Sequence, residues 1–221
     1  MKRSISAPRQ CTLELPTWGG RRDGAGPKPT FPRDRPALPH RARPELRPYH
    51  PVHATLRVRD HVWNLRSQRS FAVIHAALAA VRRRTDFRVV HFSIQGNHLH
   101  HVVEADGNRA LATGMRALSI RIARGLNAMM GRRGPVFEDR YHARVLRTPA
   151  EVRSAVRYVV GNFESHAARR GERTSGRWVD PFSSAAASVP RVGQGVLFAE
   201  PVTAEARTWL LRRAGGGRAM G

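Results

Sequence analysis

The spacing of apolar residues predicts a regular succession of strands and helices from about residue 50 onward. Four segments alternate apolar and polar residues, or carry short β-branched and aromatic runs, as strands do. These predicted strands are residues 50–58, 87–94, 98–105 and 141–147. Three other segments repeat apolar residues every three or four positions, which is the period of a helix. The predicted helices are residues 68–84, 109–130 and 149–169.

The last predicted helix has the clearest start signal in the chain. Thr148 stands at the N-cap, Pro149 at the first helical position and Glu151 three residues after the cap, which is a capping box. The order of elements is therefore β-α-β-β-α-β-α. Its first six members follow the ferredoxin-like order, an α+β fold in which an antiparallel sheet carries helices on one face. We expect the other face of the sheet to be open for a functional site.

The chain divides into three regions by composition. Residues 1–46 are rich in Pro, Gly and Arg and lack apolar periodicity, so they are expected to form a disordered basic leader. Such a leader could lie along a phosphate backbone or serve only to keep the chain soluble. We place the folded domain at residues 47–172 and an irregular tail at residues 173–221. Within the tail, residues 203–214 are expected to form a short helix that is capped by its first residue and docks through Trp209 and its neighbours.

Basic residues outnumber acidic ones by more than two to one. The chain has 39 Lys and Arg against 16 Asp and Glu, a formal net charge of +23, and only Lys2 and Lys28 are lysines. Arginine makes planar, bidentate contacts with phosphate, so nucleic acid is the leading partner. A high-GC codon bias would also enrich arginine, but it does not explain the scarcity of acids. Charge alone leaves the activity open, since a ribosomal or nucleoid-binding protein would be equally basic.

Several classes of protein and site are excluded by what the sequence lacks. Cys11 is the only cysteine, so an internal disulfide or a thiolate metal site is not possible. No apolar run approaches the length of a membrane span, and the first 20 residues lack the apolar core of a signal peptide. We therefore expect a cytoplasmic protein that makes no membrane contact.

Two histidines on one predicted strand are the first candidates for chemistry. Successive side chains on a strand point to opposite faces, so His98 and His100 share one face while Leu99 points into the other layer. Two neutral imidazoles side by side are suitable ligands for a divalent metal ion. Because the chain has 11 histidines, chance accounts for an isolated His-x-His motif at least as well.

A tyrosine on the last predicted helix lies away from the apolar side of that helix. At about 100° per residue, Val152 and Val159 fall on one side, whereas Tyr158 falls well outside that arc. Asn162 lies one turn later, on the same face as Tyr158. A tyrosine that only filled the core would be expected on the valine side. The placement fits either a functional residue or a partly exposed structural tyrosine.

Three short motifs occur in a fixed order along the chain. They are Gly-Asn-His-Leu-His at 96–100, Gly-Pro-Val-Phe-Glu-Asp-Arg-Tyr-His at 134–142 and Tyr-Val-Val-Gly-Asn at 158–162. With these motifs, residues 50–171 resemble the single-tyrosine, HUH-type transposases of insertion sequences, especially the REP-associated tyrosine transposases (RAYTs). The resemblance covers a little over half of the chain.

The resemblance implies a metal-dependent tyrosine transposase that nicks DNA and transfers strands. Tyr158 would attack a DNA phosphate, release a 3′-hydroxyl and remain joined to the 5′ phosphate, so that rejoining needs no ATP. His98 and His100, with Asn162, would hold Mg²⁺ or Mn²⁺ against the scissile phosphate. The implied substrate is single-stranded or hairpin DNA, in DNA transposition or in REP-type hairpin processing. The enzyme would be a monomer or a homodimer in the bacterial cytoplasm, associated with the nucleoid through DNA.

Arginine side chains are expected to line the groove that holds this DNA. The candidates are Arg121, Arg124, Arg132, Arg133 and Arg140. Each of them fits an ordinary solvated surface position nearly as well.

Three residues near the motifs call for separate expectations. Family members often have proline directly after the asparagine, whereas Phe163 stands here, so the helix is expected to stay straighter. His101 should point toward the helix layer, as a core residue with a backbone hydrogen bond. Glu104 shares the face of the histidine pair and is expected to be a surface acid rather than an outer ligand or base.

The main alternative is a non-catalytic, domesticated protein that binds single-stranded nucleic acid on the same fold. A ferredoxin-like sheet can bind strands by stacking alone. Against this, the third strand carries histidines where stacking aromatics would be needed, and aromatic residues are only 7% of the chain. A structural zinc site is disfavoured because the domain has no cysteine ligands.

Overall fold

A computed structural model of the chain describes residues 44–163, 179–188 and 202–215. Nearly all of the predicted leader, residues 1–43, lies outside the described residues. Leu46, near the end of that leader, is buried, and its backbone N–H donates to the side-chain carbonyl of Asn108 at 2.8 Å. The last residues of the predicted leader therefore pack with the folded domain.

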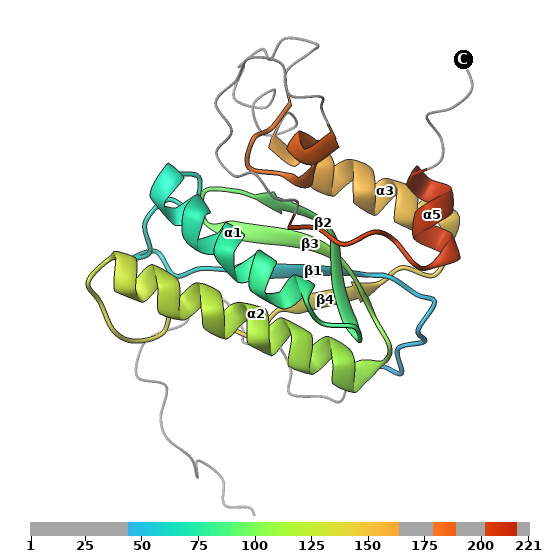
Figure 1. The fold of residues 1–221 in the computed structure, drawn as a ribbon, viewed down its shortest axis with the longest axis horizontal. Coiled ribbons are helices and arrows are strands. Elements are labelled where there is room, and N and C mark those ends of the chain that lie inside the picture. The colour runs from blue at the N-terminus through green and yellow to red at the C-terminus, as the bar shows by residue number, and fades with distance from the viewer. Residues whose placement is uncertain (1–43, 164–178, 189–201, 216–221) are drawn as a thin grey trace, which may run out of the picture. The chain divides into compact units, whose positions relative to one another are not determined.

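Four strands form one antiparallel sheet (Figure 1). They are β1 (Val52–Arg57), β2 (Phe87–Ile94), β3 (His98–Ala105) and β4 (His142–Val145). Their order across the sheet is β2-β3-β1-β4, which places β1 and β3 in the centre. This arrangement confirms the predicted ferredoxin-like α+β fold. The hairpin between β2 and β3 turns at residues 95–97.

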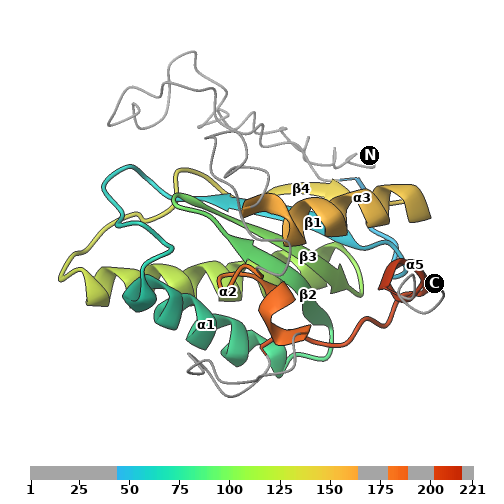
Figure 2. The same ribbon diagram turned by 90° about the horizontal axis from the view of Figure 1, so that it is seen from above.

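Two helices cover one face of the sheet, as Figures 1 and 2 show. α1 (Gln68–Arg82) and α2 (Asn108–Met129) pack against each other and against the strands. Their apolar sides form the main core with alternate strand residues, and Leu99 of β3 is fully buried there. Gly114 allows α2 to approach the sheet closely, because a Cβ at this position would overlap the ring of Phe87.

The other face of the sheet carries α3 (Pro149–Val160), as Figure 2 shows. The predicted capping box is present: the Glu151 N–H donates to Thr148 Oγ1 at 3.2 Å, and the Thr148 N–H donates to Glu151 Oε2 at 3.1 Å. Val159 of α3 is fully buried and shares a second core with Val102 of β3. The apolar side of α3 therefore occupies part of the face that we expected to be open, and a site must lie beside the helix.

α3 ends earlier than the predicted helix, which runs to residue 169. Gly161 stands at its C-cap, and the Gly161 N–H donates to the Arg157 carbonyl at 2.8 Å. Asn162 and Phe163 are helical again, while residues 164–169 lie outside the described residues. The break falls at Gly161, whose φ of −95° and ψ of 11° are open to any residue, so the expectation that Phe163 leaves the helix straighter stays a prediction.

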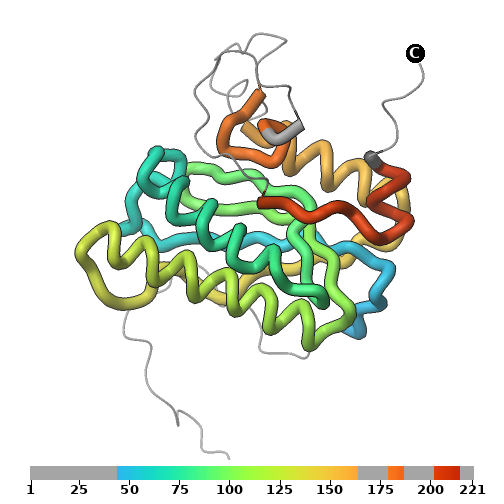
Figure 3. Tube along the Cα trace, in the orientation of Figure 1, coloured from blue at the N-terminus to red at the C-terminus, as the bar shows by residue number. Residues whose placement is uncertain are grey.

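The described part of the C-terminal tail contains η1 (Ser184–Ser188) and α5 (Trp209–Gly215). Figure 3 shows the segment before α5 running beside β2, where the Ala204 N–H donates to the Val89 carbonyl at 2.8 Å. This segment therefore extends along the edge strand of the sheet instead of forming the first turn of a helix.

α5 starts later than the predicted helix, and the predicted docking is confirmed for the neighbours of Trp209 but not for Trp209 itself. It begins at Trp209 and not at Thr203, and the Leu211 N–H donates to Thr208 Oγ1 at 3.4 Å. Leu210 and Leu211 are buried in the second core, whereas Trp209 is 57% exposed. The leucines rather than the tryptophan hold this helix on the domain, because they are the residues that face α3.

Glu104 fixes the C-terminal segment to the sheet, which corrects the expectation that it is a surface acid. Its side chain is fully buried on β3 and accepts backbone N–H bonds from Arg207 at 3.0 Å and from Thr208 at 2.7 Å. The guanidinium of Arg88, itself buried, donates to the same carboxylate at 3.0 Å. Burial alone would raise the pKa of Glu104, but the N–H bonds from Thr208 and Arg207 and the Arg88 contact hold it below the ordinary value.

We predict that Glu104→Gln lowers the free energy of unfolding by about 3 kcal/mol, since it leaves the buried Arg88 with only the exposed Asp106, at 3.8 Å, as a countercharge. Urea unfolding at pH 7 measures this. The exposed Glu45→Gln is the matched control and should change stability by less than about 0.5 kcal/mol. Because the pKa of Glu104 is lowered, its contribution is complete above about pH 4.5 and is lost as the pH falls through the lowered value. Equal stability of Glu104→Gln and the wild type would contradict this assignment.

Candidate active site

The two histidines of the His-x-His motif lie together on the α3 side of the sheet. His98 and His100 occupy the same face of β3, and their ring centroids are 4.8 Å apart with the planes nearly perpendicular. Leu99 between them is fully buried in the opposite core. The shared face predicted from strand periodicity is therefore present. Since β3 is a central strand held on both sides, the two imidazoles have a rigid backbone beneath them.

A third histidine and a threonine, both from β1, contact the inner imidazole. His53 Nε2 and Thr55 Oγ1 each lie 3.2 Å from His100 Nδ1. Thr55 pairs directly with His100 in the register of the sheet. Burial, with smaller effects of His142 and Arg144, lowers the pKa of His53 to about 4, so this ring is neutral at pH 7. A neutral His53 can accept the Nδ1–H of His100, which is the tautomer that leaves Nε2 of His100 as a lone-pair donor.

Sequence reasoning missed His53 and Thr55. The only signal was that they alternate along the first predicted strand, as His98 and His100 do along the third. Finding them required the knowledge that the first and third strands are neighbours with Thr55 opposite His100, which follows from the sheet topology. Periodicity within one strand does not supply that register.

Tyr158 of α3 lies beside the same imidazole. Its ring centroid is 5.2 Å from that of His100 and 5.9 Å from that of His53, both in edge-to-face geometry. The side chain is 46% exposed, as its position off the apolar side of the helix predicted. The tyrosine and the histidine pair therefore meet within a single chain, with the tyrosine on the solvent side.

Asn162 is almost completely buried, at 1% exposure. Neither its side-chain oxygen nor its nitrogen has a hydrogen-bond partner among the described residues. A buried amide without partners costs about 1–3 kcal/mol, and such groups are rare in folded proteins. An unsatisfied amide at this position is the arrangement expected of a group that binds something other than the protein.

The chain after α3 is held close to the β2–β3 hairpin by a cation–π contact. The guanidinium of Arg66 lies 3.9 Å from the ring centroid of Phe163 and donates to the carbonyl of Ile94 at 2.9 Å. Arg66 also makes two hydrogen bonds to the carboxylate of Asp180, at 2.9 and 2.8 Å. Phe163, the residue that replaces the proline common in the resembled family, therefore anchors this end of the helix.

These contacts bracket the position of Asn162 along the sheet. Tyr158, four residues earlier, lies at His100, and Phe163, the next residue, is held at Ile94, which pairs with Leu99. The segment that carries Asn162 thus passes along the first residues of β3, where His98 and His100 stand. The structure brings together the elements that carry all four predicted chemical residues.

No three His, Cys, Asp or Glu side chains form a metal-binding group within residues 44–163, 179–188 and 202–215.

The third histidine of the run, His101, points toward α1 and α2 as predicted and is fully buried. Burial, reinforced by His53, lowers its pKa to about 3, so it is neutral. Neither ring nitrogen makes a hydrogen bond of good geometry among the described residues, but the backbone of Ala54, which pairs with His101, acts on the ring in the direction of the expected backbone hydrogen bond and opposes the lowering of the pKa.

The five predicted DNA-binding arginines are all exposed. Arg121 and Arg124 belong to α2, on the sheet face opposite the histidine pair. Arg132 lies near the loop that adjoins the β2–β3 hairpin, with its guanidinium 3.5 Å from the His61 carbonyl. The structure therefore distributes these five residues over more than one face of the domain.

No family model matches this chain, and no curated protein matches it. Among solved structures, the chain is similar to a REP-associated tyrosine transposase bound to a REP hairpin, with a TM-score of 0.51 and 16% sequence identity. The alignment covers 77% of this chain and 99% of that one. At this identity the similarity shows that the two proteins share a fold, an α+β domain built on a four-stranded antiparallel sheet.

Proposed function

We propose that the chain is a metal-dependent, single-tyrosine enzyme that cleaves and rejoins DNA, of the REP-associated tyrosine transposase kind. The observation that carries this proposal is the contact of the Tyr158 ring with His100, on the face that His100 shares with His98. The shared fold with a transposase bound to a REP hairpin supports DNA as the substrate. The high positive charge of the chain supports the same conclusion.

In the proposed reaction Tyr158 Oη attacks a DNA phosphorus. The phenol gives up its proton, a bond forms between the tyrosine oxygen and phosphorus, and the bond between phosphorus and the 3′ oxygen breaks. The leaving 3′ oxygen takes up a proton, and the tyrosine remains joined to the 5′ phosphate. Attack of a 3′-hydroxyl on this phosphotyrosine reverses the step and joins strands, with the same number of phosphoester bonds before and after. The partly exposed position of Tyr158 allows a strand to reach it.

His98, His100 and Asn162 would hold the metal ion. The two imidazoles share a face, and the buried amide of Asn162 has no partner among the described residues, so the donor set fits a divalent cation. When bound, Mg²⁺ or Mn²⁺ would polarise the phosphoryl oxygens and orient them for in-line attack. Two nitrogen donors favour Mn²⁺, because Mg²⁺ prefers oxygen ligands. His53 would accept the Nδ1–H of His100 and so orient its ring, with Thr55 Oγ1 beside the same nitrogen.

The proposed substrate is single-stranded or hairpin DNA. The enzyme would act in the bacterial cytoplasm, associated with the nucleoid through this DNA. One chain supplies Tyr158 and both histidines, so a monomer suffices for the chemistry and a homodimer is not required. Within the described residues no helix is long and apolar enough to cross a membrane. A non-catalytic single-strand-binding protein remains the alternative, and it is distinguished by the absence of any covalent product.

We predict that the wild-type protein forms a covalent adduct with labelled hairpin DNA in the presence of Mn²⁺ or Mg²⁺, detected after denaturation. Tyr158→Phe should give no detectable adduct, because the attacking oxygen is missing. Tyr49→Phe is the matched control, since Tyr49 is 57% exposed but lies outside the site, and it should react like wild type. An adduct with Tyr158→Phe, or none with wild type, would refute the mechanism.

The Asn162 amide can be tested by stability as well as by activity. Asn162→Leu has similar volume and removes the unsatisfied amide, so it should raise the free energy of unfolding of the metal-free protein by about 1 kcal/mol. It should also lower adduct formation about tenfold or more, as loss of a metal-site group does. Asn127→Leu is the control, because Asn127 already donates to the Gly134 carbonyl at 2.8 Å and should gain no stability. A destabilised, fully active Asn162→Leu would show that the amide is structural.

The role of His53 can be tested by the metal dependence of the reaction. His53→Phe keeps a ring but removes the acceptor for His100, so the Mn²⁺ concentration needed for half-maximal adduct formation should rise about tenfold. The maximal adduct yield should be recovered at saturating Mn²⁺. His61→Phe, on an exposed loop, should leave the Mn²⁺ dependence unchanged. An unaltered Mn²⁺ dependence in His53→Phe would remove His53 from the site.

A further inference from the structure

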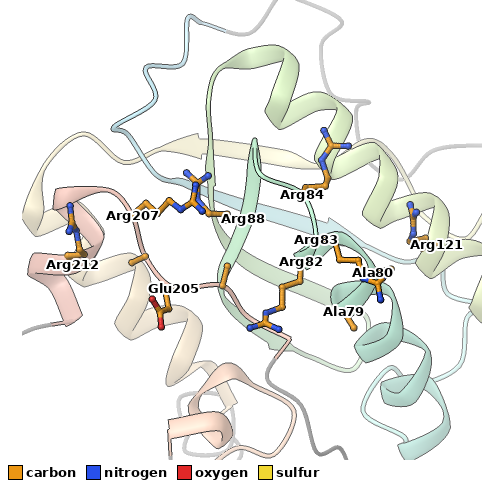
Figure 4. A pocket seen from close by; sticks show the side chains of 12 residues that line it. Ala79, Ala80, Arg82, Arg83, Arg84, Arg88, Arg121, Glu205, Arg207 and Arg212 are labelled. Carbon is orange, nitrogen blue, oxygen red and sulfur yellow. The ribbon is translucent and has the colours of Figure 1, made fainter.

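An arginine-rich pocket lies away from Tyr158, at the edge of the sheet (Figure 4). It has a volume of about 1240 Å³ and lies between the end of α1, β2 and the segment that leads into α5. Five exposed arginines line it from elements far apart in the sequence. They are Arg82, Arg83, Arg121, Arg207 and Arg212. We call this set the edge arginines.

The positive charge of this pocket is not balanced by the residues that the structure describes. Two further arginines in its wall are paired, Arg84 with Asp86 at 2.7 Å and Arg88 with Glu104 at 3.0 Å. None of the edge arginines makes an ion pair within the part of the chain that the structure describes. Glu205 is the single acid in the described wall. Five unpaired guanidinium groups against one carboxylate form a concentrated positive potential.

The pocket is assembled by contacts that hold it in shape. Glu104 binds the backbone N–H groups of Arg207 and Thr208, which fixes the segment carrying Arg207 beside β2. The hydrogen bond from the Ala204 N–H to the Val89 carbonyl fixes the same segment three residues before Arg207. The presence of Arg82 and Arg83 at this position could be explained by the favourable interaction of cations with the C-terminus of a helix, here α1. That explanation does not apply to Arg207, which precedes a helix, or to Arg121, which lies within α2.

The chemistry of the wall selects the kind of ligand. Apart from arginine and Glu205 the wall consists of alanines, with no aromatic side chain among its residues. Guanidinium groups bind phosphate bidentately, whereas unpaired bases are usually held by stacking on aromatic rings. The pocket is therefore suited to the phosphates of consecutive nucleotides whose bases are paired with each other, as they are in the stem of a hairpin.

The distance from this pocket to the proposed active site suits such a stem. On β2, Arg88 lies in the pocket wall, and Ser93, five positions later, pairs with His100. Five residues of strand span about 17 Å, which is about five base-pair steps of a duplex at 3.4 Å each. A short base-paired stem can thus reach from the arginine-rich pocket to the proposed active site.

We propose that the edge arginines bind the phosphate backbone of the paired stem of a hairpin DNA while the adjoining single strand reaches Tyr158. This inference rests on the proposed function for the identity of the substrate. It adds a second binding site that distinguishes hairpins from unpaired strands by their backbone, without reading the bases.

The test compares a pocket variant with a charge-matched control in the Tyr158→Phe background, so that binding is measured without cleavage. The pocket variant is Arg82→Gln, Arg83→Gln and Arg207→Gln, and the control replaces three exposed arginines outside the pocket, Arg109, Arg116 and Arg153, by Gln. For a DNA hairpin with a single-stranded flank, the pocket variant should bind at least tenfold more weakly than the control. The slope of log affinity against log salt should be shallower by about 2–3, as expected for three lost phosphate contacts. Binding of the flank alone should differ less than twofold between the two variants.

Three results would overturn the inference. They are equal hairpin binding by the two variants, an equal loss on the flank alone, or a selective loss for an RNA hairpin but not for the DNA hairpin. Thermal unfolding of both variants shows whether the substitutions preserve the fold. Failure of the proposed enzymatic function is a separate result, because it appears as the absence of a Tyr158 adduct while the stem-dependent binding loss persists.

Discussion

The packing of α3 on the second face of the sheet is the contact on which the proposed site depends. Val159 shares a core with Val102 of β3, and this apolar contact fixes the rotation of the helix about its own axis. Because the side of α3 that carries Val159 is packed on the sheet, the preceding residue, Tyr158, is turned toward His100 at the border between core and solvent. The cation–π contact of Arg66 with Phe163 then fixes the far end of the same segment. The site is therefore a consequence of helix packing and not of a flexible loop.

The polar groups at this border carry a cost in stability that the rest of the domain offsets. Asn162 is buried without a partner among the described residues, and His53 is held neutral by its burial. On the opposite side of the sheet a continuous apolar core, with Leu99 and Leu118 fully buried, supports the same strands. Local violations of polar satisfaction inside an otherwise consistent fold are typical of functional sites. This contrast supports a binding role for Asn162 more strongly than its spacing from Tyr158 does.

Periodicity predicted the elements and their type because each helix and strand buries one side. β2 and β3 have the predicted bounds, and the capping box places the start of α3 correctly. The features that periodicity missed depend on contacts between distant segments. The burial of Glu104 depends on its hydrogen bonds with Arg207 and Thr208, which lie about 100 residues later in the chain. The contact of His53 with His100 depends on the pairing of β1 with β3. The end of α3 was missed because the predicted helix continues through Gly161, where α3 has its C-cap.

Tyr158 is proposed to become joined to DNA, and the most direct measurement is to locate that bond. Wild-type protein would be reacted with hairpin DNA and Mn²⁺, digested with nuclease and protease, and examined by tandem mass spectrometry. We expect a nucleotide attached through its 5′ phosphate to the peptide that contains Tyr158, and to no other tyrosine. A phosphate on Tyr49 or Tyr141, or no modified peptide under conditions in which the protein binds the hairpin, would contradict it.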